Sequence, residues 1–215
     1  NMSKTLGPIH YMMYEKIKFQ DKITDYLMDG HIQDIKQDPV STKPLEEILD
    51  QENIHGYLQE KIDIVETRLA KALNLAKDPD EKLYKLGQEC GKDKDFSSFE
   101  QVFRDLNTYL LDGMPCDQGL SAMVDGESLY LITNNNLHSK YDEEIDLEKS
   151  KEATCEGGHG HDHHESFEIQ EGNLDLKEEN STYHTHRLAF LKGYFSDSPY
   201  DVELINGINY KISPR

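Results

Sequence analysis

The feature that most constrains the fold is a long apolar stripe with helical spacing in the first third of the chain. Its members recur every three or four positions, which places them on one face of an α-helix. They are Leu45, Ile48, Leu49, Leu58, Ile62, Val65, Leu69 and Leu73. Because such a face must be covered by another element, the stripe predicts one helix from about Thr42 to Ala76 inside a packed structure. Gly56 interrupts the pattern and predicts a bend or a close helix contact.

Three further segments have the same spacing, so the sequence predicts a bundle of about four helices. The first begins at Pro8 and ends before Gly30. The third opens at Ser97, which stands three residues before Glu100 in a capping-box pattern, and is expected to end at Gly113. The last helix is expected over residues 176–195, and one or two extra helical turns over 81–89.

Strand signals are fewer and cluster toward the C-terminus. Residues 128–133 are rich in β-formers, and residues 166–169 form a short candidate strand. Residues 200–205 and 208–212 flank Asn206-Gly207, a pair that tolerates the two positive φ angles of a type I′ turn. The expected fold class is therefore mainly α with a small antiparallel sheet that includes this hairpin, or α+β if the sheet is counted.

The length and the patterning favour a single domain, spanning residues 2–215. Within it we expect a helical portion at 2–113, a strand-containing region at 127–170 and a helix followed by the hairpin at 171–215. The strand-containing region carries an acidic and His-rich insertion.

Charge excludes two classes of partner. The formal net charge is −19, from 23 basic and 42 acidic residues, whereas phosphate backbones and anionic membranes are bound by clustered Lys and Arg. We therefore expect neither a nucleic acid nor a membrane as partner. The sequence shows no secretory signal and no apolar run of about 18 residues. Its three cysteines are odd in number and read as reduced thiols, which indicates a cytoplasmic protein.

The most distinctive local composition lies between residues 155 and 165. This segment contains Cys155 and four imidazoles among glycines and carboxylates; the imidazoles belong to His159, His161, His163 and His164. Thiolate and neutral imidazole are preferred ligands of divalent transition metals such as zinc, nickel and iron. The segment therefore predicts metal capture, and the alternative is an ordinary solvated loop.

A second candidate metal site lies on the apolar stripe itself. Glu52 and His55 form a Glu-x-x-His pair, and on a helix this spacing places both side chains on one face. Inside a bundle they must be paired with each other or bound to a metal. Di-iron bundles use this unit twice, and here it occurs once, so the pattern supports at most a mononuclear site. The alternatives are a buried Glu–His hydrogen bond or a solvent-facing His55.

Three other positions could complete such a core site: His10 on the first helix, Cys116 or Asp117 after the third helix, and His138 after a strand. Each has a structural alternative, such as a hydrogen-bonded interface histidine or a buried cysteine. If the first two helices were antiparallel, His10 and His55 would lie at different heights, at roughly 30 Å and 15–20 Å from the connecting loop. Only a bend or a long connection would bring them level.

The chain contains none of the common sequence signatures of nucleotide binding, serine hydrolases or zinc proteases. The function that these patterns favour is a soluble metal-binding helical protein, with a mononuclear site in the core and a His-rich capturing loop. The alternative is a non-enzymatic binding or scaffold protein, with homodimerisation left open and only adventitious metal binding. Whether the protein is an enzyme stays open.

Overall fold

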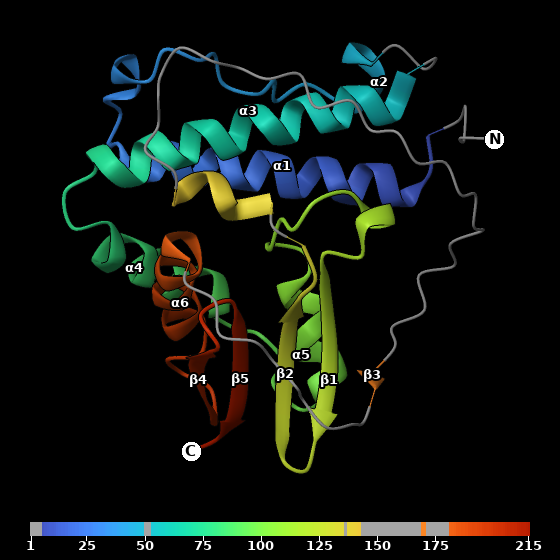
Figure 1. The fold of residues 1–215 in the computed structure, drawn as a ribbon, viewed down its shortest axis with the longest axis vertical. Helices are drawn as coiled ribbons and strands as arrows, with labels where there is room; N and C mark the ends of the chain where they lie inside the picture. Colours follow the sequence, from blue (N-terminus) through green and yellow to red (C-terminus); the bar gives the residue numbers. More distant parts are fainter. Residues whose placement is uncertain (1–5, 50–52, 136, 143–168, 171–180) are drawn as a thin grey trace.

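The protein has a mixed α+β fold (Figure 1). The computed structural model describes residues 6–49, 53–135, 137–142, 169–170 and 181–215. Its helices are α1 (Pro8–Leu27), α2 (Leu45–Ile48), α3 (Ile54–Leu75), α4 (Pro79–Gly91), α5 (Phe99–Leu106) and α6 (Thr182–Tyr194), with 3-10 turns η1 (Ile32–Asp34), η3 (Pro115–Asp117) and η4 (Leu137–Tyr141). Its strands are β1 (Leu120–Asp125), β2 (Ser128–Thr133), β3 (Ile169–Gln170), β4 (Tyr200–Ile205) and β5 (Asn209–Pro214).

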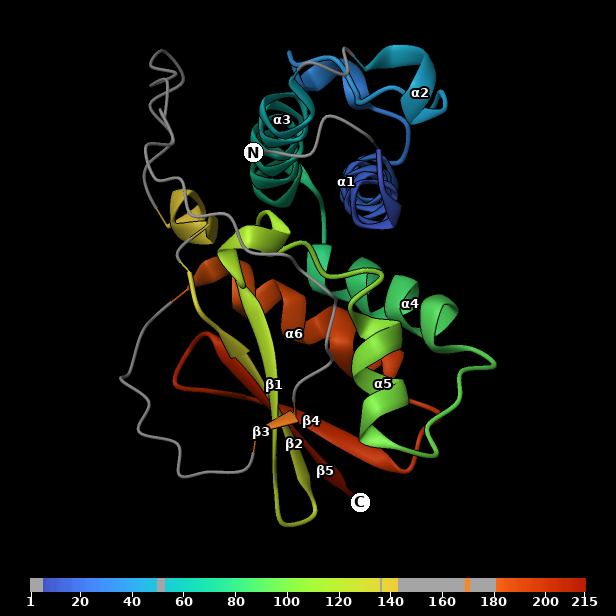
Figure 2. The same cartoon turned by 90° about the vertical axis from the view of Figure 1, so that its right-hand side faces the viewer.

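The strands form one sheet in the order β3-β1-β2-β5-β4. All neighbouring strands are antiparallel except β3, which pairs with β1 in parallel through two residues. Helices α4, α5 and α6 lie on one side of this sheet, with α6 against β4 and α4 packed on α6, whereas α1 and α3 lie side by side across the end of the sheet (Figures 1 and 2). The predicted bundle of about four helices is not confirmed, because the helices divide between these two layers and the sheet covers part of α6.

Helices α1 and α3 run parallel to each other. Gln20 of α1 contacts Glu66 of α3 across 46 positions, and Asp21 contacts Arg68 across 47. A nearly constant separation is the mark of parallel neighbours, because both partners advance together. The chain makes this possible by returning along the pair after α1 (Figure 1). The N-terminal ends of the two helices therefore lie at the same end of the layer.

The predicted helix over 42–76 is two helices. A second helix starts at Ile54, because the Asn53 side chain caps it by accepting a hydrogen bond from the Gly56 backbone N–H at 3.2 Å. A Cβ atom at position 56 would lie 2.4 Å from Asn53 Nδ2. Gly56 therefore leaves room for the helix cap and is not the site of a mid-helix bend.

Other element ends also differ from the prediction. Helix α5 is capped by Ser98, whose hydroxyl accepts from the Gln101 N–H, and it ends at Leu106, well before the predicted end at Gly113. In the hairpin, Asn206 and Gly207 have φ angles of 51° and 76°, as the turn signal predicted. The last paired residues are Ile205 and Asn209, so the second strand begins one residue later than predicted and the loop has three residues, 206–208.

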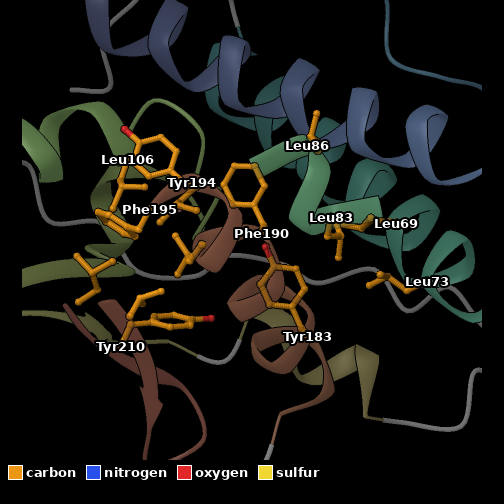
Figure 3. Close-up of a cluster of buried hydrophobic side chains, with 14 of the residues drawn as sticks. Leu69, Leu73, Leu83, Leu86, Leu106, Tyr183, Phe190, Tyr194, Phe195 and Tyr210 are labelled. Carbon is orange, nitrogen blue, oxygen red and sulfur yellow. The ribbon is translucent and has the colours of Figure 1, made fainter. Parts of the chain in front are cut away.

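The apolar core consists of two clusters. One lies between the first halves of α1 and α3; its members include Met13, Tyr14, Ile17, Leu58, Ile62 and Val65. The other joins the second halves of these helices to α4, α6 and the sheet (Figure 3); its members include Leu69, Leu73, Leu83, Leu86, Phe190, Tyr194 and Tyr210. Buried polar side chains separate the clusters, among them Gln20 and Glu66.

Candidate functional site

His10 and His55, predicted metal ligands from different helices, are neighbours in the structure. Their ring centroids are 5.8 Å apart and the ring planes are nearly perpendicular, at 85°. Each residue lies in the first turn of its helix. Because α1 and α3 run parallel, His10 and His55 lie at the same height along the two helices. Of the two alternatives that the sequence allowed, a bend or a long connection, the structure has the long connection.

His10 also has a local structural role. Its Nδ1 accepts a hydrogen bond from the Gly7 backbone N–H at 2.9 Å, which satisfies a donor at the start of α1. The side chain is buried, and this burial lowers the pKa of His10, with a further contribution from His55. His10 is therefore held as the neutral imidazole, which is the form that binds metal ions.

The spacing of the two rings fits a shared metal ion with a small adjustment. Two imidazoles bound tetrahedrally at about 2.1 Å have ring centroids about 5 Å apart, slightly less than the 5.8 Å observed. One condition follows from the hydrogen bond to Gly7. Because Nδ1 of His10 accepts, its proton is on Nε2, so a metal ion at Nε2 must shift the tautomer and displace the cap.

The remaining predicted ligands do not join this pair within the described residues. Glu52, Cys155, His159, His161, His163 and His164 lie outside them. Because α3 begins at Ile54, the argument that Glu52 and His55 share one helix face no longer applies. Asp117 Oδ2 accepts from the Met114 N–H at 3.0 Å and closes the turn η3, beside the exposed Cys116.

His138 lies in a different place, in a buried polar network. It is on η4 and is 3% exposed. Its Nδ1 is 2.8 Å from Glu66 Oε2 on α3, and its Nε2 is 3.1 Å from Asp112 Oδ1 in the segment after α5. With both ring nitrogens directed at carboxylates, neither is available for a metal ion in this arrangement.

Arg187 of α6 completes the network. Its Nη1 donates to both Asp112 carboxylate oxygens, at 2.9 and 3.0 Å, and its Nη2 donates to Leu111 O at 3.1 Å. Nη2 also donates to the Tyr183 hydroxyl at 2.7 Å. The Tyr183 ring in turn stacks on His138, with centroids 3.5 Å apart.

The charges of this network balance when His138 is protonated. Burial disfavours the imidazolium, but Glu66 and Asp112 outweigh that effect and raise the pKa of His138. Burial likewise disfavours the Asp112 carboxylate, yet Arg187 and His138 hold the pKa of Asp112 well below its usual range. Two carboxylates therefore face two cations in the protein interior, which satisfies the requirement that buried charges be paired.

A second histidine nearby is kept neutral. Burial, together with the positive charges of Arg187 and His138, lowers the pKa of His184 to about 2. Its Nδ1 is 2.7 Å from the Tyr210 hydroxyl, which donates to the His184 backbone carbonyl at 3.2 Å. His186, two residues further on, instead contacts Asp80 of α4 at 2.6 Å. The two histidines therefore diverge on α6, as their spacing predicts for a helix.

The sequence analysis did not predict Glu66, Asp112 or Arg187 as members of a site. For Glu66 a signal existed, because it follows Leu58 and Ile62 at four-residue intervals and so lies on the apolar stripe. A carboxylate in that position requires a buried partner. Nothing in the local pattern around Asp112 or Arg187 indicates burial, since their partners lie on other elements.

Comparison with known proteins finds no matching family model, no similar curated sequence and no similar solved structure. Among the described residues, none of the helices has the length and apolar character needed to span a bilayer. In the same part of the chain, no three His, Cys, Asp or Glu side chains are arranged to hold a metal ion. A metal ion at the His10–His55 pair would therefore have two ligands from the described residues, and further ones would have to come from residues that the structure does not describe.

Proposed function

We propose that this protein binds a divalent transition metal ion, such as zinc, nickel or iron, through His10 and His55. The observation that carries the proposal is the approach of the two rings to 5.8 Å from parallel helices. Neutral imidazoles in such an arrangement are suitable ligands for these ions.

The remaining ligands are assigned from the sequence. Glu52 stands three residues before His55, and the segment from Cys155 to His164 carries a thiol and four imidazoles. Either source could raise the ligand number to the three or four of a typical zinc site. The strongly acidic composition favours cation binding at both.

The test is metal content and affinity in purified, tag-free protein. We expect wild-type protein to bind zinc or nickel, and the double variant His10→Ala/His55→Ala to lose a stoichiometric equivalent. A variant lacking 155–164 retains this equivalent if Glu52 completes the site and loses it if the segment does. His31→Ala is the matched control, because His31 is an exposed histidine outside the helices. Equal metal content in wild type and the double variant would contradict the core site. No metal in any sample would overturn metal binding altogether.

The pH dependence of binding provides a second measurement. Unperturbed imidazoles have a pKa near 6.5, so affinity at the 155–164 segment is expected to fall between about pH 7 and pH 5. His10 has a lowered pKa, so His10 should remain a metal ligand at lower pH than the histidines of the 155–164 segment do. Calorimetric titrations of the deletion variant and of the double variant separate the two profiles.

A second candidate function is that of a binding protein without a resident metal. A groove of about 570 Å³ lies between the end of α6 and the β4–β5 hairpin, lined among others by Tyr84, Lys192, Phe195, Tyr200 and Arg215. This volume is in the range of small-ligand sites. Thermal-shift screening of small organic acids and aromatics, repeated on Lys192→Ala, would identify an occupant or remove this candidate.

A further inference from the structure

The Nε2 atom of His138 has two alternative hydrogen-bond partners. Asp112 Oδ1 is 3.1 Å away and can accept a proton from it. Arg187 Nη2 is 3.3 Å away, and its two N–H groups already donate to Leu111 O and to the Tyr183 hydroxyl. A protonated Nε2 therefore bonds to Asp112, whereas an unprotonated Nε2 can accept from Arg187 only if Nη2 gives up one of these two bonds. Loss of the proton from Nε2 thus changes its bond to Asp112 and the bonding of Arg187 together.

We propose that His138 is a proton-dependent latch that ties the α1–α3 layer to the layer of α6 and the sheet. In the charged state its two N–H groups link Glu66 on α3 to Asp112, which is held by Arg187 on α6. In the neutral state only one N–H remains, so one of the two carboxylate contacts is lost. This inference is independent of the proposed metal site.

The groups that face His138 come from every element packed around it. They are Glu66 from α3, Asp112 from the segment after α5, Tyr141 from η4, and Tyr183, His184 and Arg187 from α6. The tyrosine hydroxyls stay neutral because burial raises the pKa of Tyr141 and of Tyr183. His184 stays neutral as well. Among the histidines and tyrosines of this set, His138 is therefore the one that is protonated and can lose its proton as pH rises.

Loss of the His138 proton leaves an excess negative charge in the interior. Two carboxylates, Glu66 and Asp112, then face the single cation Arg187. Because the pKa of His138 is raised in the folded state, its contribution to stability is complete below about pH 6.5 and is lost as pH rises through the folded value. The latch accordingly holds at acidic pH and loosens at alkaline pH.

A small apolar pocket lies between the layers beside this network. The pocket has a volume of about 30 Å³; its walls include Phe19, Gln20, Leu69, Tyr183 and Arg187, from both layers. Gln20, Tyr183 and Arg187 belong at the same time to the polar network or contact it. Separation of the layers would therefore open this pocket, which at its present size accommodates about one or two water molecules.

Hydrogen exchange at several pH values tests the latch. Protection factors, corrected for intrinsic exchange, would be measured with chelator present for backbone amides of residues 137–141 and of α3 around Glu66. We expect protection in wild type to fall as pH rises above about 6.5 and through the folded pKa of His138, by a factor of ten for each unit by which the folded pKa exceeds the unfolded one. His138→Gln should abolish this pH dependence. His186→Gln, at a partly exposed histidine of α6 that contacts Asp80, is the control and should retain it.

A second variant covers the case in which His138→Gln does not fold. Glu66→Gln keeps a hydrogen-bond acceptor but removes one negative charge, so the transition should move to lower pH. An NMR titration of the His138 imidazole in wild type should give a midpoint above 6.5. A midpoint at or below this value, or the same pH-dependent protection in wild type and His138→Gln, would overturn the latch. Because all samples are metal-free, failure here is distinct from failure of the metal site.

Discussion

Removal of Arg187 tests whether the buried network works as one charge-balanced unit. In Arg187→Met the long cationic side chain is replaced by an uncharged one. Asp112, whose side chain is only 4% exposed, then keeps His138 as its one remaining cationic partner. The hydrogen bonds to Leu111 O and the Tyr183 hydroxyl are lost as well. The interior then contains one more negative than positive charge.

The expected cost is large on the scale of protein stability. Breaking a buried ion pair by removing one partner destabilises by about 3–5 kcal/mol, whereas domains of this size unfold with about 5–15 kcal/mol. Asp112→Asn has the opposite imbalance, one excess positive charge, and should cost a similar amount. The double variant Asp112→Asn/Arg187→Met restores the balance, because Glu66 and His138 still form a neutral pair.

The assay is urea unfolding at pH 7, with a double-mutant cycle. We expect the double variant to be more stable than the sum of the single changes predicts, by about 2–3 kcal/mol. The matched surface pair is Arg104 and Glu100, an exposed ion pair one helical turn apart on α5. Its cycle should give only about 0.3–0.5 kcal/mol. Additive effects at Asp112 and Arg187 would refute the reasoning, since independent sites share no charge balance.

Three further outcomes follow from the backbone. Gly87→Ala should lower the free energy of unfolding by at least about 1–3 kcal/mol although alanine favours helices, because its Cβ atom would lie 2.0 Å from Phe190 O. Unchanged stability would mean that α4 and α6 do not cross so closely. Gly207→Val should cost about 1 kcal/mol or more, since a β-branched residue resists the φ of 76°; a neutral effect in thermal melts would contradict the turn. Ser98→Ala should cost about 0.5–2 kcal/mol through loss of the Gln101 cap, and Ser98→Thr should recover most of it.

Local chemistry was sufficient to predict several elements of this protein. The periodicity of the apolar residues marked α1 and the greater part of α3, and Asn206-Gly207 marked the hairpin through its positive φ angles. Both signals act over a few residues, which is why they can be read without the tertiary structure. The new helix start at Ile54 was missed because the apolar stripe continues across it in the sequence. The Asn53 side chain, which caps α3, competes there with continuation of a single helix.

The sites depended on the tertiary structure to different degrees. His10 and His55 were recognisable by residue type, yet their approach to 5.8 Å required parallel helices, which a long return connection supplies. Glu66, Asp112, His138 and Arg187 come from four separate parts of the chain. Charge pairing in the interior depends on distances between elements and on exclusion of water, so only the packed structure could decide which of the many charged residues are buried together.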